Sequence, residues 1–311
     1  MFNIMGYAKW SSDAYEHLKG SYSRKSRADI FKHTRSRRIS DAMDPYGLTF
    51  RESRDSEAHP NSLAIGVFLD VTGSMGRIPE LLIRHKLGAL MDTLIDHGVA
   101  DPQVMFSAIG DHVCDKAPLQ AGQFESGTKE LNECLSDIFI ESGGGGGATE
   151  SYLLAWLVGG RHTSIDCFEK RDTKGFLFTV GDECSWESID AGALKALMGY
   201  EETETLTARG LLAEAQRMYH VFHIHINETS YRDNPHVISY WRDLLGQNFL
   251  ILDDHRGLAE LIASTVALYQ GAALETVTAG FDSSTAANVK RALARVSAGV
   301  TGRPESGVIR L

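Results

Sequence analysis

One short stretch, Asp70–Gly76, constrains the fold more than any other part of the sequence. It follows an unbroken apolar run, Leu63–Leu69, whose length fits a strand that is covered on both faces. It precedes a helical pattern from Ile78 to about His97, which Gly98 closes. A strand that turns sharply into a helix is a unit of an open α/β sheet, and ligands bind such sheets at the edge where these turns lie.

The turn carries hard oxygen donors at alternate positions, namely the carboxylate of Asp70 and the hydroxyls of Thr72 and Ser74. Gly73 and Gly76 allow the backbone to turn tightly between them. Carboxylate and hydroxyl oxygens suit Mg2+ or Mn2+ far better than Zn2+. The pattern therefore predicts a divalent-cation site at the end of the first core strand.

A second loop with oxygen ligands begins at a glycine run. Five glycines, Gly143–Gly147, precede Thr149 and lead directly into a helical pattern. No Gly-Lys-Ser/Thr follows them, which excludes a P-loop, and they do not follow a strand as the glycines of a Rossmann dinucleotide turn do. This loop offers the hydroxyls of Ser142, Thr149 and Ser151 as oxygen donors, and the sequence alone leaves the choice among them open.

A third loop, with a carboxylate, follows a later core strand. The apolar pattern Lys174–Val180 predicts that strand, and Asp182 comes two residues after it. Strand and helix patterns alternate along the chain, which predicts an α/β fold with a doubly wound sheet. The other predicted strands cover residues 103–110, 220–226 and 248–252, with a short edge strand over 114–119. The later predicted helices cover residues 128–140, 151–160, 191–198, 207–218, 235–245 and 258–268.

Together these loops resemble the von Willebrand factor A (vWA) family, of the bacterial intracellular type. The metal-ion-dependent adhesion site (MIDAS) of that family begins Asp-x-Ser-x-Ser, where this chain has Thr72 for the first serine, and it continues with a Thr and an Asp in later loops. The resemblance implies a doubly wound, mostly parallel six-stranded sheet with helices on both faces. It also implies a Mg2+ (or Mn2+) ion held by Asp70, Thr72, Ser74, Thr149 and Asp182.

The resemblance divides the chain into three parts. Residues 1–60 are a basic and polar N-terminal extension, and residues 61–270 are the vWA-like domain. Residues 271–311 are a C-terminal tail, rich in Ala, Thr and Ser, that we expect to be partly helical or disordered.

Composition and charge exclude several classes of protein. The 311-residue chain has a net charge of −10, which argues against general affinity for nucleic acid. No apolar run reaches the roughly 18 residues of a membrane span, and the N-terminus lacks the pattern of a signal peptide. The four cysteines have neither metal-binding nor redox spacing. These features predict a cytoplasmic protein with reduced thiols and no membrane contact.

The resemblance implies binding rather than catalysis. Neutral hydroxyls and two carboxylates leave a divalent ion with an open position, which an Asp or Glu of a protein partner can fill. Bacterial intracellular members of the family often work with AAA+ ATPases, so the resemblance suggests an AAA+ ATPase as one partner. The sequence specifies neither the partner's identity nor the pathway nor the oligomeric state.

Two other functions stay open. A Mn2+- or Mg2+-dependent phosphoester hydrolase would need a general base, for which Glu150, Glu183 and Asp111 are the candidates near the predicted site. Nucleic-acid binding is disfavoured by the net charge of the whole chain. The basic segment Arg24–Arg38, with seven Lys or Arg residues and one Asp, nevertheless keeps such a local contact open.

Two zinc patterns are weaker. His112 and Cys114 follow a predicted strand together with Asp111, but no second Cys/His pair stands at ligand spacing. His223 and His225 share one face of another predicted strand, where a third and a fourth ligand are missing. We therefore expect neither pattern to bind zinc.

Overall fold

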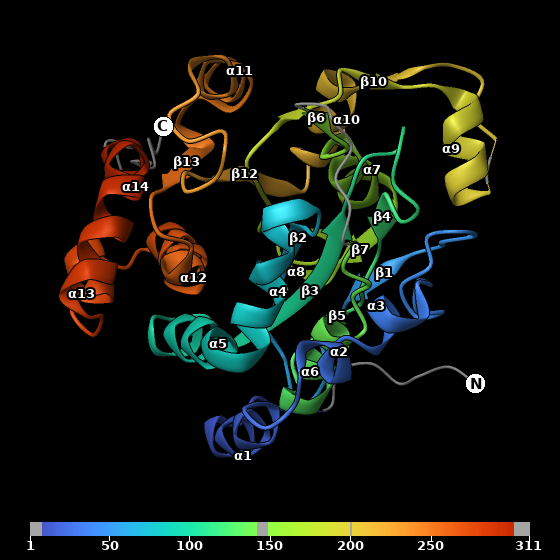
Figure 1. Cartoon of the computed structure of the whole chain (residues 1–311). Coiled ribbons are helices and arrows are strands. Elements are labelled where there is room, and N and C mark those ends of the chain that lie inside the picture. Colours follow the sequence, from blue (N-terminus) through green and yellow to red (C-terminus); the bar gives the residue numbers. More distant parts are fainter. Residues whose placement is uncertain (1–7, 142–148, 200, 302–311) are drawn as a thin grey trace.

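A central, mostly parallel sheet organises the fold in a computed structural model that describes residues 8–141, 149–199 and 201–301, without the side chains of Ser74 and residues 297–301 (Figure 1). Within these residues the sheet has seven strands in the order β13-β12-β8-β2-β3-β4, and the short β5 also pairs with β3. Neighbours from β13 to β3 are parallel, whereas β4 and β5 are antiparallel to β3. The strands are β2 (Ser62–Asp70), β3 (Asp101–Ile109), β4 (Leu119–Gln120), β5 (Phe124–Glu125), β8 (Gly175–Gly181), β12 (Tyr219–Ile226) and β13 (Phe249–Leu252).

Helices cover both faces of this sheet. Phe222 and His223 are neighbours in β12, so their side chains point to opposite faces. The ring of Phe222 contacts Tyr269 of α12 with centroids 5.8 Å apart, and the ring of His223 stacks on Trp241 of α11 at 3.6 Å. On the first face α12 packs against α5, and on the second α7 packs against α10 and α11 (Figure 1). These helices are α5 (Leu87–Asp96), α7 (Leu153–Arg161), α10 (Ala208–Ala215), α11 (Pro235–Leu245) and α12 (Leu258–Tyr269).

The predicted fold class, an α/β doubly wound and mostly parallel sheet, is therefore confirmed, although the main sheet has seven strands rather than six. The additional strand is the two-residue β5, which is too short to leave an alternating pattern in the sequence. None of the described helices is long and apolar enough to cross a membrane.

The helix expected over residues 78–97 is interrupted. It consists of three segments: α4 (Arg77–Leu81), the π-helical turn η2 (Leu82–Lys86) and α5. A π turn inserts one residue into the helix and so rotates the positions on either side relative to each other. Leu82 and Leu87 are buried as a result, whereas Leu81 is half-buried and His85 is exposed. The long helix expected over these residues is therefore present, with a π turn in it that the sequence did not predict.

The edge strand predicted over residues 114–119 is mostly a turn. Val113 N–H donates to Asp111 Oδ1 at 2.9 Å, and Asp115 N–H donates to the Asp111 carbonyl at 2.8 Å. These hydrogen bonds form a turn directly after β3. The Asp111 side chain accepts a backbone hydrogen bond that a neighbouring strand would otherwise accept. Within the predicted range, only Leu119 belongs to a strand.

Both segments outside residues 61–270 pack on the domain. Tyr15 and Phe31 in the first segment, and Val289 and Leu293 in the second, belong to the same hydrophobic core as the sheet. Their elements are α1 (Ser12–Tyr22), α2 (Arg27–Ile30), α3 (Lys32–Ser36), β1 (Arg51–Ser53), α13 (Leu274–Thr278) and α14 (Ser283–Thr301). The division into three parts stays a prediction, and residues 302–311 lie outside the described part of the chain.

The remaining elements are short. Two later helices begin and end where the sequence predicted, because Asp190 caps α9 and Asn234 caps α11. The other bounds are η1 (Gly73–Gly76), α6 (Thr128–Ser136), β6 (Thr149–Glu150), β7 (Thr163–Ile165), α8 (Asp166–Glu169), β9 (Cys184–Ser185), β10 (Ser188–Ile189), α9 (Ala191–Met198), β11 (Leu206–Thr207), η3 (Gly246–Asn248) and η4 (His255–Gly257).

Candidate metal centre

Two carboxylates leave the sheet side by side at the ends of neighbouring strands. The chain runs from β2 to β3 on one side and later returns to β8 on the other, so the strand order reverses at β2. Leu69 pairs with Val180 across β2 and β8, and Asp70 and Asp182 follow within two residues. Asp70 is 1% exposed and Asp182 is 6% exposed. Open α/β sheets bind their ligands at such a reversal.

The loop before α7 reaches the same edge. Its short strand β6 pairs in parallel with β9, which follows Asp182 in the sequence. Ser151 N–H donates to the Gly110 carbonyl at 3.2 Å, and this bond ties the loop to the end of β3. The described parts of the three predicted loops therefore meet. Residues 142–148, which include the glycine run and Ser142, lie outside the described part.

Asp70 is fixed by hydrogen bonds to both of its carboxylate oxygens. Thr72 donates to Oδ1 from its N–H at 2.8 Å and from its hydroxyl at 2.7 Å. Tyr152 donates to Oδ2 at 3.2 Å. Gly181 leaves room for this tyrosine, because a Cβ at position 181 would lie 1.7 Å from the phenol oxygen. Of the predicted ligands Asp70 and Thr72 are thus in direct contact, and the side chain of Ser74 is not described.

A buried carboxylate that was not among the predicted ligands, Glu150, also belongs to the cluster. Its Oε1 lies 3.2 Å from Thr72 Oγ1, and its Oε2 has no hydrogen-bond partner among the described residues, although the residue is only 4% exposed. Thr149 is half-buried. Neighbouring residues of a strand point to opposite sides, so a Glu150 that faces Thr72 turns Thr149 away from it. From the sequence, Glu150 was only a candidate general base, because the pairing of β6 with β9 cannot be recognised in the sequence.

The carboxylates of this cluster have raised pKa values. Burial and the charge of Asp182 raise the pKa of Asp70 to about 7. Burial and neighbouring carboxylates raise the pKa of Glu150 to about 10 and that of Glu183 to about 8. Burial also raises the pKa of Asp182, against the opposing charge of Arg77. Without a cation these carboxylates therefore hold protons more readily than exposed ones do, and a bound divalent cation would take the place of those protons.

A second acidic group is formed by Glu228, Asp254 and His255. Within the part of the chain that the structure describes, the ligand atoms of these three residues all lie close enough together to share an ion, whereas Asp70, Glu150 and Asp182 form no such group of three. His255 Nδ1 is 2.5 Å from Glu228 Oε2, and Arg256 Nη2 is 2.6 Å from Asp254 Oδ2. Because these carboxylates have basic partners, the group does not require a cation.

The two zinc patterns form no such group within the described residues. His112 contacts the Ser151 hydroxyl at 2.7 Å, and its ring meets the edge of Trp186. His223 and His225 are buried in the sheet. Burial lowers the pKa of His225 to about 4, so this histidine is neutral at pH 7.

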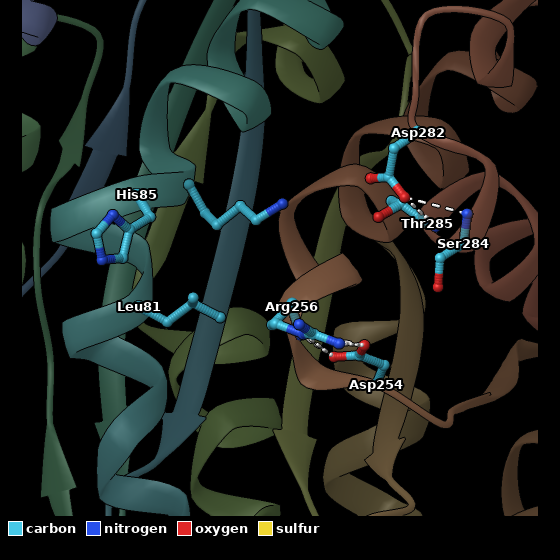
Figure 2. Close-up of a pocket in the computed structure, with 8 residues that line it drawn as sticks. Leu81, His85, Asp254, Arg256, Asp282, Ser284 and Thr285 are labelled. Atoms are coloured by element: carbon cyan, nitrogen blue, oxygen red, sulfur yellow. Dashed lines mark hydrogen bonds and ion pairs between the residues drawn. The ribbon is translucent and has the colours of Figure 1, made fainter.

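A cavity of about 440 Å³ lies between η2 and the start of α14 and contains none of the predicted ligands (Figure 2). Its polar lining is paired internally. Arg256 binds Asp254, and Asp282 Oδ1 accepts from the N–H groups of Ser284 and Thr285 at 3.0 Å each. These pairs leave few groups with which to recognise a ligand, and we assign none to this cavity.

The basic segment Arg24–Arg38 lies beside the predicted metal loop. Arg27 Nη2 donates to the Gly76 carbonyl at 2.6 Å, and Ile140 N–H donates to Thr34 Oγ1 at 2.8 Å. All Lys and Arg residues of this segment are exposed. A positively charged surface therefore flanks the acidic edge of the sheet.

Comparison with known proteins adds little to this geometry. No family model and no curated protein matches the chain. Solved structures that resemble it include the pilus adhesin SpaC of Lactobacillus rhamnosus GG in its open conformation, with 10% identity over 68% of this chain and 31% of that one, at a TM-score of 0.41. Another is a von Willebrand factor type A protein from Catenulispora acidiphila, with 14% identity over 73% of this chain and 50% of that one, at a TM-score of 0.36.

The chain spans half or less of the length of these two proteins. At such TM-scores the likeness carries no argument about the site, and the fold stands on the sheet topology described above. Membership of the vWA family, the bound ion and the compartment remain predictions from the sequence.

Proposed function

We propose that this chain is a protein-interaction module of the vWA type, in which a Mg2+ or Mn2+ ion at the carboxyl edge of the sheet makes the contact with a partner. The observation that supports this most is the pair Asp70 and Asp182. Both are buried at the strand-order reversal, and among the described residues neither forms a salt bridge, although the charge of Arg77 lowers the pKa of Asp182 in part. Buried charges in proteins are paired or bind metals, so an unpaired pair of this kind favours a cation.

The donor set fits a hard divalent ion. Asp70 and Asp182 offer carboxylates, and Thr72 offers a hydroxyl that is already aligned by its bond to Asp70. With Ser74 and a ligand from the loop before α7, these residues would fill five positions of an octahedral shell. When bound, the ion would supply an electrophilic position for an acidic side chain of the partner.

The partner proposed here is therefore a protein that presents an Asp or Glu. The exposed cations of Arg24–Arg38 beside the site favour an acidic surface around that residue, because opposite charges speed and orient association. An AAA+ ATPase is the partner class that the vWA resemblance suggests, and no residue of this chain identifies it further.

The test is a metal-dependent capture. The full chain and its Asp70→Ala variant are immobilised and exposed to a bacterial lysate in Mg2+ or in EDTA. We expect one or more proteins that bind only the wild-type chain in Mg2+ and that a soluble Asp/Glu-rich peptide displaces. An identical set of bound proteins in EDTA, or on the variant, would contradict the proposal.

A further inference from the structure

We infer that Glu150, rather than a hydroxyl of the same loop, is the ligand that the loop before α7 supplies to the proposed ion. This inference rests on the proposed function, because it concerns the same site. Glu150 would then join Asp70 and Thr72 around the ion.

The first argument is the orphaned oxygen. Both oxygens of Asp70 already accept hydrogen bonds from Thr72 and Tyr152. In contrast, Glu150 Oε2 has no hydrogen-bond partner among the described residues, although Glu150 is only 4% exposed. A buried carboxylate oxygen without a donor costs free energy, and the cost is removed when a cation binds it.

The second argument concerns the single hydrogen of the Thr72 hydroxyl. Thr72 Oγ1 lies 2.7 Å from Asp70 Oδ1 and 3.2 Å from Glu150 Oε1, but one hydrogen serves one acceptor at a time. With Asp70 the nearer acceptor, Glu150 Oε1 receives at most a share of this hydrogen, so neither oxygen of Glu150 has a full hydrogen bond among the described residues.

The third argument is orientation. The Glu150 backbone is held by the pairing of β6 with β9 and by the bond from Trp186 N–H to the Glu150 carbonyl at 3.0 Å. With Glu150 turned toward Thr72, the alternation of a strand directs Thr149 to the other side. Both residues cannot face the same ion while β6 keeps this pairing.

A further carboxylate changes what the site can do. Ligand charge sets the affinity of oxygen sites for divalent ions, so the chain should hold Mn2+ or Mg2+ without any help from a partner. Positions of the octahedral shell that Asp70, Thr72 and Glu150 leave free would still be open to a partner's Asp or Glu. The partner would then add to an existing metal site rather than complete it.

The experiment is a calorimetric titration of Mn2+ into the metal-free full chain and into three variants. Glu150→Gln keeps the size and hydrogen-bonding groups but removes the charge, Thr149→Val removes the competing hydroxyl, and Asp70→Ala is the control without the core ligand. We expect Glu150→Gln to lose affinity about 10-fold or more, since even outer-shell partners of metal ligands are worth about 10–100-fold. Thr149→Val should change it by less than about 2-fold.

The outcomes separate this inference from the proposed function. Wild-type affinity in Glu150→Gln, with binding lost in Asp70→Ala, would overturn the role of Glu150 and keep the metal site. It would mean that Glu150 is a buried neutral acid that donates to Thr72. A large loss in Thr149→Val would assign the ligand to that hydroxyl instead, and no binding by the wild-type chain would overturn both proposals. Circular dichroism of each variant checks folding, and Glu150→Asp, which keeps the charge, provides a second variant with an expected intermediate affinity.

Discussion

Two clusters of carboxylates lie at opposite ends of β2, and their pKa values shift in opposite directions. At the end of the strand, Asp70 and Glu150 have pKa values raised to about 7 and about 10. At the start of the strand, where Asp55 Oδ1 accepts from Ser62 N–H at 3.1 Å, the pKa values of Asp55 and Asp166 are lowered. Carboxylates at the two ends of one strand thus respond in two ways.

The difference lies in the cations. At the start of β2, burial alone would raise the pKa of Asp166, but hydrogen bonds from Lys170 and Arg54 outweigh it. Lys170 Nζ is 2.6 Å from Asp166, and Arg171 Nη1 is 2.5 Å from Asp55. We call Asp55 and Asp166, with their partners Arg54, Lys170 and Arg171, the paired cluster. We call Asp70, Glu150, Asp182 and Glu183 the unpaired cluster. Among the described residues, the unpaired cluster therefore lacks the close cations that stabilise the paired one.

The largest expected effect is the loss of metal binding in Asp70→Ala. This substitution removes the carboxylate that orders Thr72, so we expect Mn2+ and Mg2+ affinity to fall by about 100-fold or more, beyond the effect of an outer-shell partner. Isothermal titration calorimetry measures it. Asp166→Ala, in the paired cluster, is the matched control and should bind metal as the wild type does. An equal loss of metal affinity in both variants would mean that the paired and the unpaired cluster do not differ in metal binding.

Next in size is the stabilisation by metal. A ligand that binds only the folded state at 100 times its dissociation constant stabilises it by about 2.7 kcal/mol. We expect this gain in urea unfolding of the wild-type chain with Mn2+, and no gain in Asp70→Ala. Equal stabilisation of both proteins would place the ion elsewhere, for instance at Glu228, Asp254 and His255.

A comparable loss of stability is expected when the paired cluster is broken. Arg54→Met keeps the aliphatic stem but removes bonds to Asp166 and Glu169, both at 2.9 Å. Because Lys170 still neutralises Asp166, the expected loss is about 1–3 kcal/mol, below that of a fully orphaned buried charge. Urea unfolding at pH 7 measures it, and a variant as stable as the wild type would show that the paired cluster is not held by its cations.

The pH dependence of the metal-free protein should also separate the clusters. For Asp70 the folded pKa is raised, so its contribution to stability is present below about pH 4 and is lost as the pH rises through about 7. For Asp55 and Asp166 the folded pKa is lowered, so their contribution is present above about pH 4 and is lost as the pH falls through the folded values.

Asp70→Asn removes the first contribution and keeps the shape of the side chain. Between pH 5 and pH 8 we therefore expect metal-free wild-type protein to lose stability relative to Asp70→Asn, by at most about 1.4 kcal/mol per pH unit. Chemical unfolding at several pH values measures this difference. Parallel stability curves for the two proteins would mean that Asp70 does not titrate in this range.

The smallest expected effect is that of Tyr152→Phe. It removes one hydrogen bond of 3.2 Å to Asp70 and leaves the two bonds from Thr72. We expect Mn2+ affinity to change by about 3-fold or less, which is within the net worth of a single hydrogen bond. A loss as large as that of Asp70→Ala would show that Tyr152, rather than the strand end, positions the ligand.

Most elements of the fold could be predicted from local patterns in the sequence. The apolar run before Asp70 forms β2. Asp190 and Asn234 are the N-cap residues at which α9 and α11 begin. The π turn η2 was not predictable, because the apolar positions of this stretch also fit a regular α-helix. A π turn differs from it by one inserted residue, which leaves no local signal in the sequence. The sequence thus specified elements more reliably than their irregularities.

The site was only partly predictable for a related reason. The position of Asp70 beside Asp182 follows from strand order, which the vWA resemblance implied. The role of Glu150 depends on the pairing of β6 with β9, and that of Tyr152 depends on the space left by Gly181. Both are contacts between residues far apart in the sequence, and no local pattern encodes them.

The most direct test of the central claim is a crystal structure of the full chain grown with Mn2+ and measured at a wavelength where manganese scatters anomalously. The account predicts one strong anomalous peak at the carboxyl edge of the sheet, within ligand distance of Asp182, Thr72 and Glu150. A peak at Glu228, Asp254 and His255 instead, or no peak in protein that is saturated with Mn2+ by calorimetry, would contradict it.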